Sequence, residues 1–151
     1  SSGLIKESPK GIPNNLFPII TNVIKNKNSH LKIYGKNYPT KDGTCVRDYI
    51  HVMDLAEGHI ALLKKNISKK GLEIYNFGAG KGVSVLEVVK EFEKVLEKKI
   101  AVKYVKRRRG DAAISFCSSK KAFRKLNWKC KLNINTAISD IKKNLIIEKK
   151  I

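Results

Sequence analysis

The chain has 151 residues, 42% of them hydrophobic, and a formal net charge of +19. That length is enough for one domain with a hydrophobic core. No run approaches the roughly 20 apolar residues of a membrane-spanning helix, and no signal-peptide pattern opens the chain, so we expect no membrane partner. The three cysteines and three histidines are too few and too unevenly spaced for a disulfide framework or a metal site, which favours a reducing, cytoplasmic compartment.

The positive charge raises the question of a nucleic-acid partner. The 32 basic residues comprise 27 lysines and 5 arginines, and the lysines are scattered along every segment. Proteins that read nucleic acid usually gather arginine and aromatic residues on one face. We therefore expect solvated surface lysines and no specific nucleic-acid partner, with a basic nucleic-acid-binding module as the alternative.

The first half of the chain predicts a loop followed by alternating helices and strands. Asn14 or Asn15 would cap the first helix, and Pro18 would lie harmlessly in its first turn. Asp54 would cap the second helix. In chain order, the predicted elements are a loop at 1–12, a helix ending at about Lys27, a strand at 31–34, a turn-rich loop at 35–43, a strand at 46–52 and a helix ending at about Lys65.

The second half continues the mixture of strands and helices. The sequence from Ser84 to Glu87 has the pattern of a capping box, and apolar residues behind it repeat at helical spacing. The predicted elements are a strand at 72–77, a helix at 85–96, a strand at 100–105 and helices at about 118–126 and 135–147. The absence of a regular βαβ series predicts a small mixed α/β or α+β unit. We expect one domain over 1–151, and the start at Ser1 without a methionine suggests a piece of a longer protein.

The segment Gly78–Gly82 lies between a predicted strand and a predicted helix, where a phosphate-binding loop would belong. A dinucleotide fingerprint would need glycine at the position of Val83, and the P-loop spacing is also absent. We therefore expect a tight turn here and no cofactor site.

The run Arg107-Arg108-Arg109-Gly110-Asp111 follows a predicted strand. Arginine suits phosphate because its planar fork makes paired, charge-assisted hydrogen bonds, and the aspartate could accept a hydrogen bond from a ligand hydroxyl. A solvated basic run explains the same residues equally well.

The stretch Gly43–His59 reads GTCVRDYIHVMDLAEGH. It resembles the GTxVRDYIHVxDLAxGH signature of the UDP-glucose (UDP-galactose) 4-epimerases, within the extended short-chain dehydrogenase/reductase superfamily. Shorter matches accompany it: IPNNLFP at 12–18, LKIYG at 31–35, an RRxGD element at 107–111 and LNW at 126–128. The resemblance spans almost the whole chain but only the C-terminal part of an epimerase. It therefore implies an α/β fold: the mixed α+β, nucleotide-sugar-binding portion, with the Rossmann part absent.

The resemblance implies a role for ten residues in binding a UDP-sugar. Asn15, with Leu16 beside it, would meet the diphosphate. Lys32, Ile33 and Tyr34 would form the strand on which uracil lies, with main-chain groups of Lys32 and Tyr34 pairing with the base edge.

The remaining implied site residues lie in the signature and in the arginine run. Arg47 and Arg108 would meet the phosphates, Tyr49 would line the same cleft, and Asp111 would meet the ribose. Arg109 stands where the family usually has glutamate. Ser115 would lie beside the sugar, where a small residue leaves room for an N-acetyl group. His51 and His59 are expected to make structural hydrogen bonds.

The catalytic residues of the family are absent from this sequence. Epimerases remove a sugar hydroxyl proton with the tyrosine of a Y-x-x-x-K pair, and no such spacing occurs here. We therefore name no catalytic and no cofactor-binding residue, and expect the chain alone to be inactive. The resemblance implies a homodimeric parent enzyme of galactose metabolism, an NAD-dependent isomerase that interconverts UDP-galactose and UDP-glucose through a 4-keto intermediate. NAD would be bound mainly by the missing N-terminal part.

Two alternatives stay open. A related UDP-sugar epimerase or dehydratase, acting on pentose or N-acetylhexosamine substrates, would share this binding chemistry. A basic nucleic-acid-binding module would explain the charge and the missing catalytic residues together.

Overall fold

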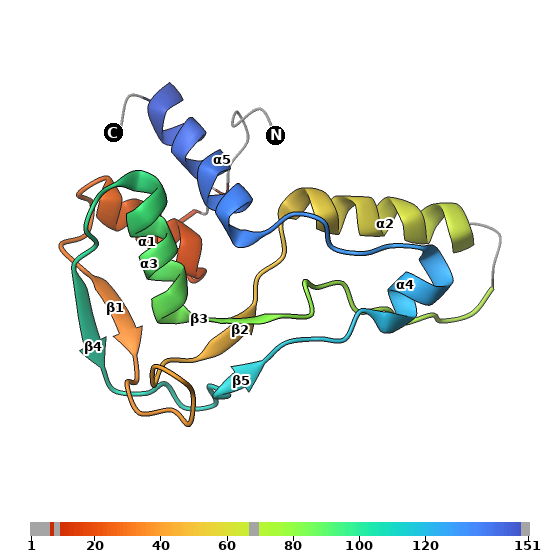
Figure 1. The fold of residues 1–151 in the computed structure, drawn as a ribbon, viewed down its shortest axis with the longest axis horizontal. Helices are drawn as coiled ribbons and strands as arrows, with labels where there is room; N and C mark the ends of the chain where they lie inside the picture. Colours follow the sequence, from red (N-terminus) through yellow and green to blue (C-terminus); the bar gives the residue numbers. More distant parts are fainter. Residues whose placement is uncertain (1–6, 8–9, 67–69, 149–151) are drawn as a thin grey trace.

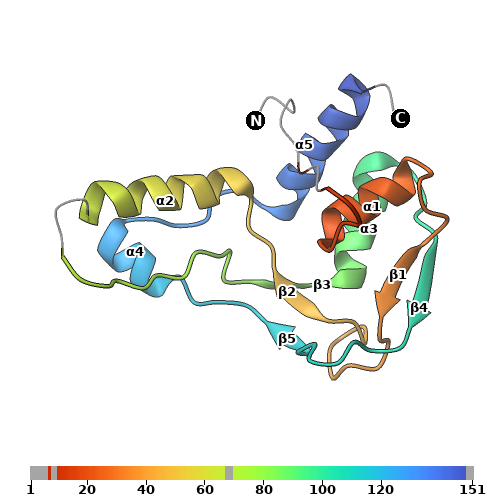
Figure 2. The same cartoon turned by 180° about the vertical axis from the view of Figure 1, so that it is seen from behind.

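The computed structural model describes residue 7 and residues 10–66 and 70–148. The molecule is elongated: α1, α3 and α5 gather at one end with β1 and β4, and α2 and α4 lie at the other (Figures 1 and 2). The elements are α1 (Leu16–Ile24), β1 (Leu31–Tyr34), β2 (Val46–Asp48), α2 (Val52–Asn66), β3 (Gly82–Ser84), α3 (Val85–Leu96), β4 (Val102–Val105), β5 (Ile114–Ser115), α4 (Lys120–Leu126) and α5 (Ile134–Ile147). The mixture of helices and short strands confirms the predicted α/β class.

Two small sheets organise the strands. β1 pairs with β4 in parallel, so both strands end on the same side. In the second sheet β2 is central, antiparallel to β3 and parallel to β5. The second sheet lies between the two groups of helices (Figure 1).

The hydrophobic core is built by α1, β1, α3 and α5. β1 alternates buried and exposed residues, because one face packs on helices and the other does not. Phe92 of α3 is fully buried and meets Phe17 of α1 edge-on, with 5.2 Å between ring centroids. The buried core residues are Ile20, Val23, Ile24, Leu31, Ile33, Val88, Val89, Phe92, Ile100, Ile138 and Leu145.

The predicted capping box is confirmed. The Ser84 hydroxyl oxygen accepts a hydrogen bond from the Glu87 N–H at 3.0 Å, and the Glu87 carboxylate accepts from the Ser84 N–H at 2.8 Å. Helix α1 is shorter than predicted and ends at Ile24, before Asn26 adopts a left-handed conformation with φ 57°. Asn15 occupies its N-cap position, but its side chain makes no capping bond.

The prediction that Asp54 caps the second helix is wrong. The helix begins two residues earlier, and the buried Asp54 carboxylate instead accepts N–H bonds from Lys131 at 3.1 Å and Leu132 at 2.8 Å. The capping interaction comes from His51, whose Nδ1 accepts the Met53 N–H at 3.1 Å. A buried charge needs several donors, and the distant 131–132 segment supplies them.

The predicted strand at 72–77 is also wrong. These residues join no ladder among the described residues, and Leu72 and Ile74 are 88% and 68% exposed. Alternating apolar residues form a strand only where a partner satisfies the backbone and covers one face. The strand predicted at 46–52 ends at Asp48, and residues 49–51 lead without regular structure into α2.

The last three elements follow the prediction with shifted boundaries. The strand predicted at 100–105 begins at Val102, and α4 begins at Lys120. Helix α5 begins at Ile134 behind Asn133, whose side chain accepts the Thr136 N–H at 3.0 Å. Within the described residues, no helix combines the length and apolar character needed to cross a membrane.

Candidate functional site

An arginine cluster forms where the carboxyl ends of the parallel strands β1 and β4 approach strand β2 of the other sheet. Arg108 Nε donates to Asp111 Oδ2 at 2.9 Å, and its guanidinium lies over the Tyr34 ring, 4.6 Å from the centroid. Arg47 Nη2 approaches the other carboxylate oxygen of Asp111 at 3.8 Å. One carboxylate therefore lies between two guanidinium groups, which leaves the trio with a net charge of +1. Open sheets commonly bind ligands at the carboxyl ends of parallel strands.

Arg47 is held in place by backbone carbonyls of its own strand and of the segment that leads into β5. Its Nη1 donates to the carbonyl oxygens of Val46 and Ala112, both at 2.8 Å. Ser115 on β5 is the register partner of Arg47, and its side chain is exposed. The parallel pairing of β2 and β5 thus places Arg47 and Ser115 next to each other.

Strand β1 presents alternate main-chain groups away from β4. The N–H groups of Leu31 and Gly35 donate to Ala101 and Val105 carbonyls at 2.7 and 2.8 Å. Successive residues of a strand point their backbone groups to opposite edges, so those of Lys32 and Tyr34 face away from β4. β1 has only β4 as a strand neighbour among the described residues. The Ile33 side chain, by contrast, is buried in the core.

Tyr49 is held neutral beside the cluster. Burial raises the pKa of Tyr49 to about 12, and the positive charge of Arg47 opposes that rise only in part. Its ring packs against Phe17 with 5.7 Å between centroids. A phenol with this pKa stays protonated near neutral pH, so Tyr49 fits a packing or hydrogen-bonding role and not that of a base.

Asn15 and Leu16 lie at the start of α1. The Asn15 amide donates to the Glu7 carboxylate at 2.8 Å, and Leu16 packs against the core. Among the described contacts, none joins Asn15 to Arg47 or Arg108. Phe17, the next residue of the helix, provides the link to Tyr49.

The neighbouring Arg107 has a different environment from Arg108. Its Nε donates to Asn37 Oδ1 at 2.8 Å, and its guanidinium lies 4.0 Å from the Tyr38 ring centroid. A side chain at Gly35 would collide with both neighbours, since an added Cβ would lie 2.6 Å from Tyr38 and 2.8 Å from Arg107. Arg107 therefore fastens the loop after β1, while Arg109 is exposed.

The glycine segment after residue 77 was predicted as a turn from a strand into a helix, but it follows no strand among the described residues and leads into β3. The N–H groups of Ala79 and Gly80 donate to the Asp48 carboxylate at 2.9 and 3.2 Å. A phosphate would need these same donors, and an internal carboxylate already occupies them. Sequence reasoning missed Asp48, although it stands next to Arg47 in the signature.

The two signature histidines make structural hydrogen bonds, as predicted. Besides Met53, His51 contacts Asp140 through Nε2 at 3.3 Å, and His59 Nδ1 lies 2.8 Å from the Leu55 carbonyl oxygen. The described residues contain no group of three or more His, Cys, Asp or Glu side chains arranged to hold a metal ion.

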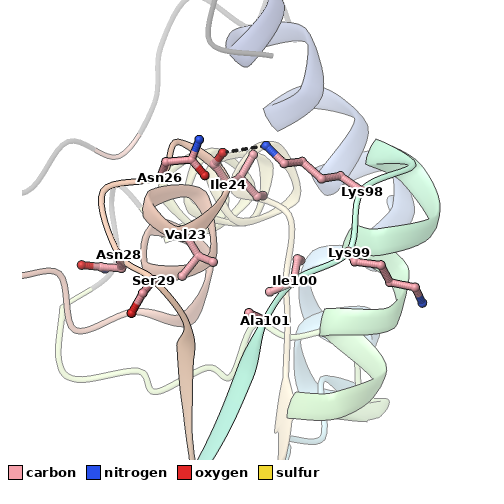
Figure 3. Close-up of a pocket in the computed structure, with 9 residues that line it drawn as sticks. All are labelled: Val23, Ile24, Asn26, Asn28, Ser29, Lys98, Lys99, Ile100 and Ala101. Carbon is pink, nitrogen blue, oxygen red and sulfur yellow. Dashed lines mark hydrogen bonds between the residues drawn. The ribbon is translucent and has the colours of Figure 1, made fainter.

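A pocket of about 190 Å³ lies at the opposite, amino ends of β1 and β4. Figure 3 shows Lys98 reaching across it to the Ile24 carbonyl, a bond of 3.1 Å, while Lys99 points outward. The Lys98 ammonium is bonded to this carbonyl, and the residues that line the pocket include none of the predicted site residues. The arginine cluster is therefore the better candidate site.

Comparison with known proteins identifies the family. A family model described as GDP-mannose 4,6 dehydratase matches residues 5–141. The chain belongs to this family. It is 52% identical over 140 residues to a UDP-glucose 4-epimerase of Cyamopsis tetragonoloba, covering 92% of this chain and 40% of that protein. It is 49% identical over 139 residues to the UDP-glucose 4-epimerase of Bacillus subtilis (strain 168), covering 92% of this chain and 41% of that protein.

Solved structures agree with the sequence comparison. A crystal structure of UDP-glucose 4-epimerase from Bifidobacterium longum, in complex with NAD+ and UDP, matches with a TM-score of 0.92 and 42% identity, covering 99% of this chain and 44% of that chain. The chain thus matches the C-terminal portion of these enzymes and spans about 40% of the length of the curated relatives. The predicted similarity to UDP-glucose 4-epimerases is confirmed.

Proposed function

We propose that this chain is the UDP-sugar-binding part of a UDP-glucose 4-epimerase, an NAD-dependent isomerase that interconverts UDP-galactose and UDP-glucose. The observation that carries the proposal is the convergence of Arg47 and Arg108 on Asp111, next to the exposed Tyr34. Two arginines can clamp a diphosphate, and a carboxylate between them can accept from a ribose hydroxyl. The fold similarity to an epimerase solved with UDP supports the assignment.

The uridine would lie along the free edge of β1. Main-chain groups of Lys32 and Tyr34 face that edge, so they can pair with the base while the Tyr34 ring packs against it. Buried Ile33 would hold the strand in place. At the other end of the ligand, Asn15 and Leu16 would approach the diphosphate from α1, with Tyr49 lining the cleft. Asn15 would then release Glu7 and turn toward the ligand.

The sugar would lie near Ser115. This side chain is small and exposed beside Arg47, so we propose that an N-acetyl group also fits. The complete enzyme would then accept UDP-N-acetylglucosamine and its galactosamine epimer. Failure of the complete enzyme to turn over the acetylated pair would contradict this part of the proposal.

NAD does not fit the glycine turn of this chain, because Asp48 occupies its N–H donors. We propose that NAD is bound mainly by another part of the protein.

Exposed apolar residues support an additional packed layer: Val52, Ile60 and Leu63 of α2 are 69%, 51% and 63% exposed, and Leu72 is 88% exposed. Val52, Ile60 and Leu63 fall within about 80° of one another around the helix axis, and an exposed apolar face usually marks an interface. We propose that the complete enzyme is cytoplasmic and a homodimer, and light scattering can check the dimer.

The proposal is tested by titrating UDP into the chain by calorimetry. Arg108→Ala should weaken UDP binding about tenfold or more, because a charge-assisted contact is lost. Arg108→Lys should be intermediate, since it keeps the charge but not the planar fork. The matched control is Arg109→Ala, the adjacent exposed arginine, which should stay within about twofold of wild type.

A second outcome would favour the nucleic-acid alternative. If the chain ignores UDP but binds a single-stranded oligonucleotide with steep salt dependence, the basic-module reading replaces the epimerase reading. Equal losses of UDP affinity in the Arg108 and Arg109 variants would show that only net charge matters.

A further inference from the structure

Asp48 joins three segments that are far apart in the sequence. It ends strand β2, directly after Arg47. Its Oδ1 accepts the Ala79 N–H at 2.9 Å, and its Oδ2 accepts the N–H groups of Gly80 at 3.2 Å and Cys117 at 3.1 Å. One carboxylate therefore ties β2 to the glycine turn and to the chain leaving β5. Hydrogen bonds to an ionised acceptor are stronger than those between neutral groups.

The surrounding packing leaves no space for a larger residue at Gly78. A Cβ added to Gly78 would lie 2.4 Å from both the Asp48 carboxylate and the Cys117 sulfur. Ser119 closes the arrangement, because its hydroxyl donates to the Gly78 carbonyl at 2.9 Å and accepts the Gly78 N–H at 3.2 Å. The close approach of the turn to Asp48 therefore depends on glycine at position 78.

The Asp48 contacts lie next to Arg47 and Ser115 but involve neither of them. β2 and β5 pair over only two residues, with Arg47 opposite Ser115. On one side the pairing is continued by the Val46 N–H to Ala113 carbonyl bond of 2.8 Å. On the other side, beyond Ser115, the bond from Cys117 to Asp48 continues the link. So short a ladder needs fastening at both ends to keep its register.

We propose that Asp48 is a positioning residue that holds β2 against β5, so that Arg47 and Ser115 face the ligand in a fixed geometry. Asp48 does not itself touch the UDP-sugar, because its carboxylate is occupied by three backbone donors. The part of this proposal that concerns the ligand, which we call the ligand clause, rests on the proposed UDP-sugar function. The part that says that Asp48 holds β2 in register with β5, which we call the register clause, concerns this chain alone.

The test compares Asp48→Asn with Asp54→Asn. Both aspartates accept two backbone N–H bonds or more, and Asp54 also accepts from the Cys130 thiol at 3.1 Å. Both substitutions should therefore lower the thermal midpoint. Only Asp48→Asn should speed hydrogen exchange of the Val46 amide, by about tenfold.

Binding of two fragments of the ligand, pyrophosphate and uridine, distinguishes a positioning role of Asp48 from a general loss of stability. Asp48→Asn should weaken binding of inorganic pyrophosphate about tenfold, through Arg47, and leave uridine binding within about twofold, because β1 belongs to the other sheet. Asp54→Asn should leave both within about twofold. Unchanged Val46 exchange and unchanged pyrophosphate affinity in a folded Asp48→Asn chain would overturn the proposal.

Exchange in the wild-type chain provides a test that needs no variant. The amides of Ala79, Gly80 and Cys117 should open together with that of Val46, with a common protection factor to within about threefold. Independent opening would refute the register clause even if Asp48→Asn does not fold. If wild type binds neither UDP nor pyrophosphate while the common opening is observed, the proposed function fails and the register clause stands.

Discussion

Aspartates organise much of the polar structure of this basic chain. Asp48 and Asp54 each accept several hydrogen bonds from segments distant in sequence, and Asp111 lies between two arginines. Asp42 accepts from the backbone and hydroxyl of Thr44 at 2.9 and 2.7 Å. The chain has only 13 acidic residues against 32 basic ones, so each of these carboxylates has many possible donors. Substituting one of these aspartates should therefore lower the free energy of unfolding more than substituting a surface lysine.

Acid titration should reveal the contribution of Asp54. Burial alone would raise the pKa of Asp54, but the N–H of Leu132, the thiol of Cys130 and the N–H of Lys131 bring it below its ordinary value of 3.8. A carboxyl with a lowered pKa in the folded state stabilises the protein above its unfolded pKa. That stabilisation is lost as pH falls through the folded pKa.

We expect Asp54→Asn to lower the free energy of unfolding by about 2 kcal/mol at pH 7. The difference from wild type should shrink as pH falls below about 4. Urea unfolding between pH 7 and pH 2 measures it. A difference that stays constant across this range would show that the Asp54 charge makes no contribution.

Among the elements, α3 has the most strongly defined start. Its capping box is complete, and Ser84 also donates from its hydroxyl to Asp42. Helix α1, by contrast, has Asn15 at its N-cap position without a side-chain cap. The two helix starts therefore form a matched pair for testing how much a cap contributes.

Ser84→Ala should lower the free energy of unfolding by about 1–2 kcal/mol, because one helix donor loses its acceptor and the Asp42 contact is lost. Asn15→Ala should change it by less than about 0.5 kcal/mol. Thermal unfolding of the two variants gives the comparison. Equal losses would mean that the capping geometry does not govern helix stability here.

At the scale of the whole molecule, the proposed binding residues lie within this chain, and the Tyr-Lys pair of the family does not. The arginine cluster is complete within this chain, while the sequence contains no Y-x-x-x-K pair and the glycine turn is filled by Asp48. The exposed apolar surface of α2 and of residues 72–74 lies at the end of the molecule away from the β1–β4 sheet (Figure 1). Binding and turnover should therefore be separable by experiment.

The 151-residue chain should bind UDP yet show no conversion of UDP-galactose, with or without added NAD. A chimera that joins it to the N-terminal portion of the Bacillus subtilis relative should interconvert UDP-galactose and UDP-glucose, and should also accept the N-acetylated pair. Coupled assays on both proteins measure this. Turnover by the chain alone would contradict the proposed division of labour.

Local signals predicted most elements but not all of their boundaries. Helices α3 and α5 could be located because apolar residues repeat at helical spacing behind polar caps. The strand at 72–77 failed because alternation records a preference for a buried face, and the described chain supplies no partner strand. The role of Asp54 cannot be predicted from its neighbours, because the donors it accepts from lie more than 70 residues away in the sequence.

The sequence by itself determined the family, the placement of most helices and the set of candidate ligand residues, since these depend on nearby residues and contiguous motifs. Only the tertiary structure decided which candidates meet. It brought Arg47, Arg108 and Asp111 together, assigned Arg107 to the loop after β1 and revealed Asp48 as the acceptor for the glycine turn. Hydrogen bonds and ion pairs act over a few ångströms in space, so contacts between segments distant in the chain leave no local pattern to read.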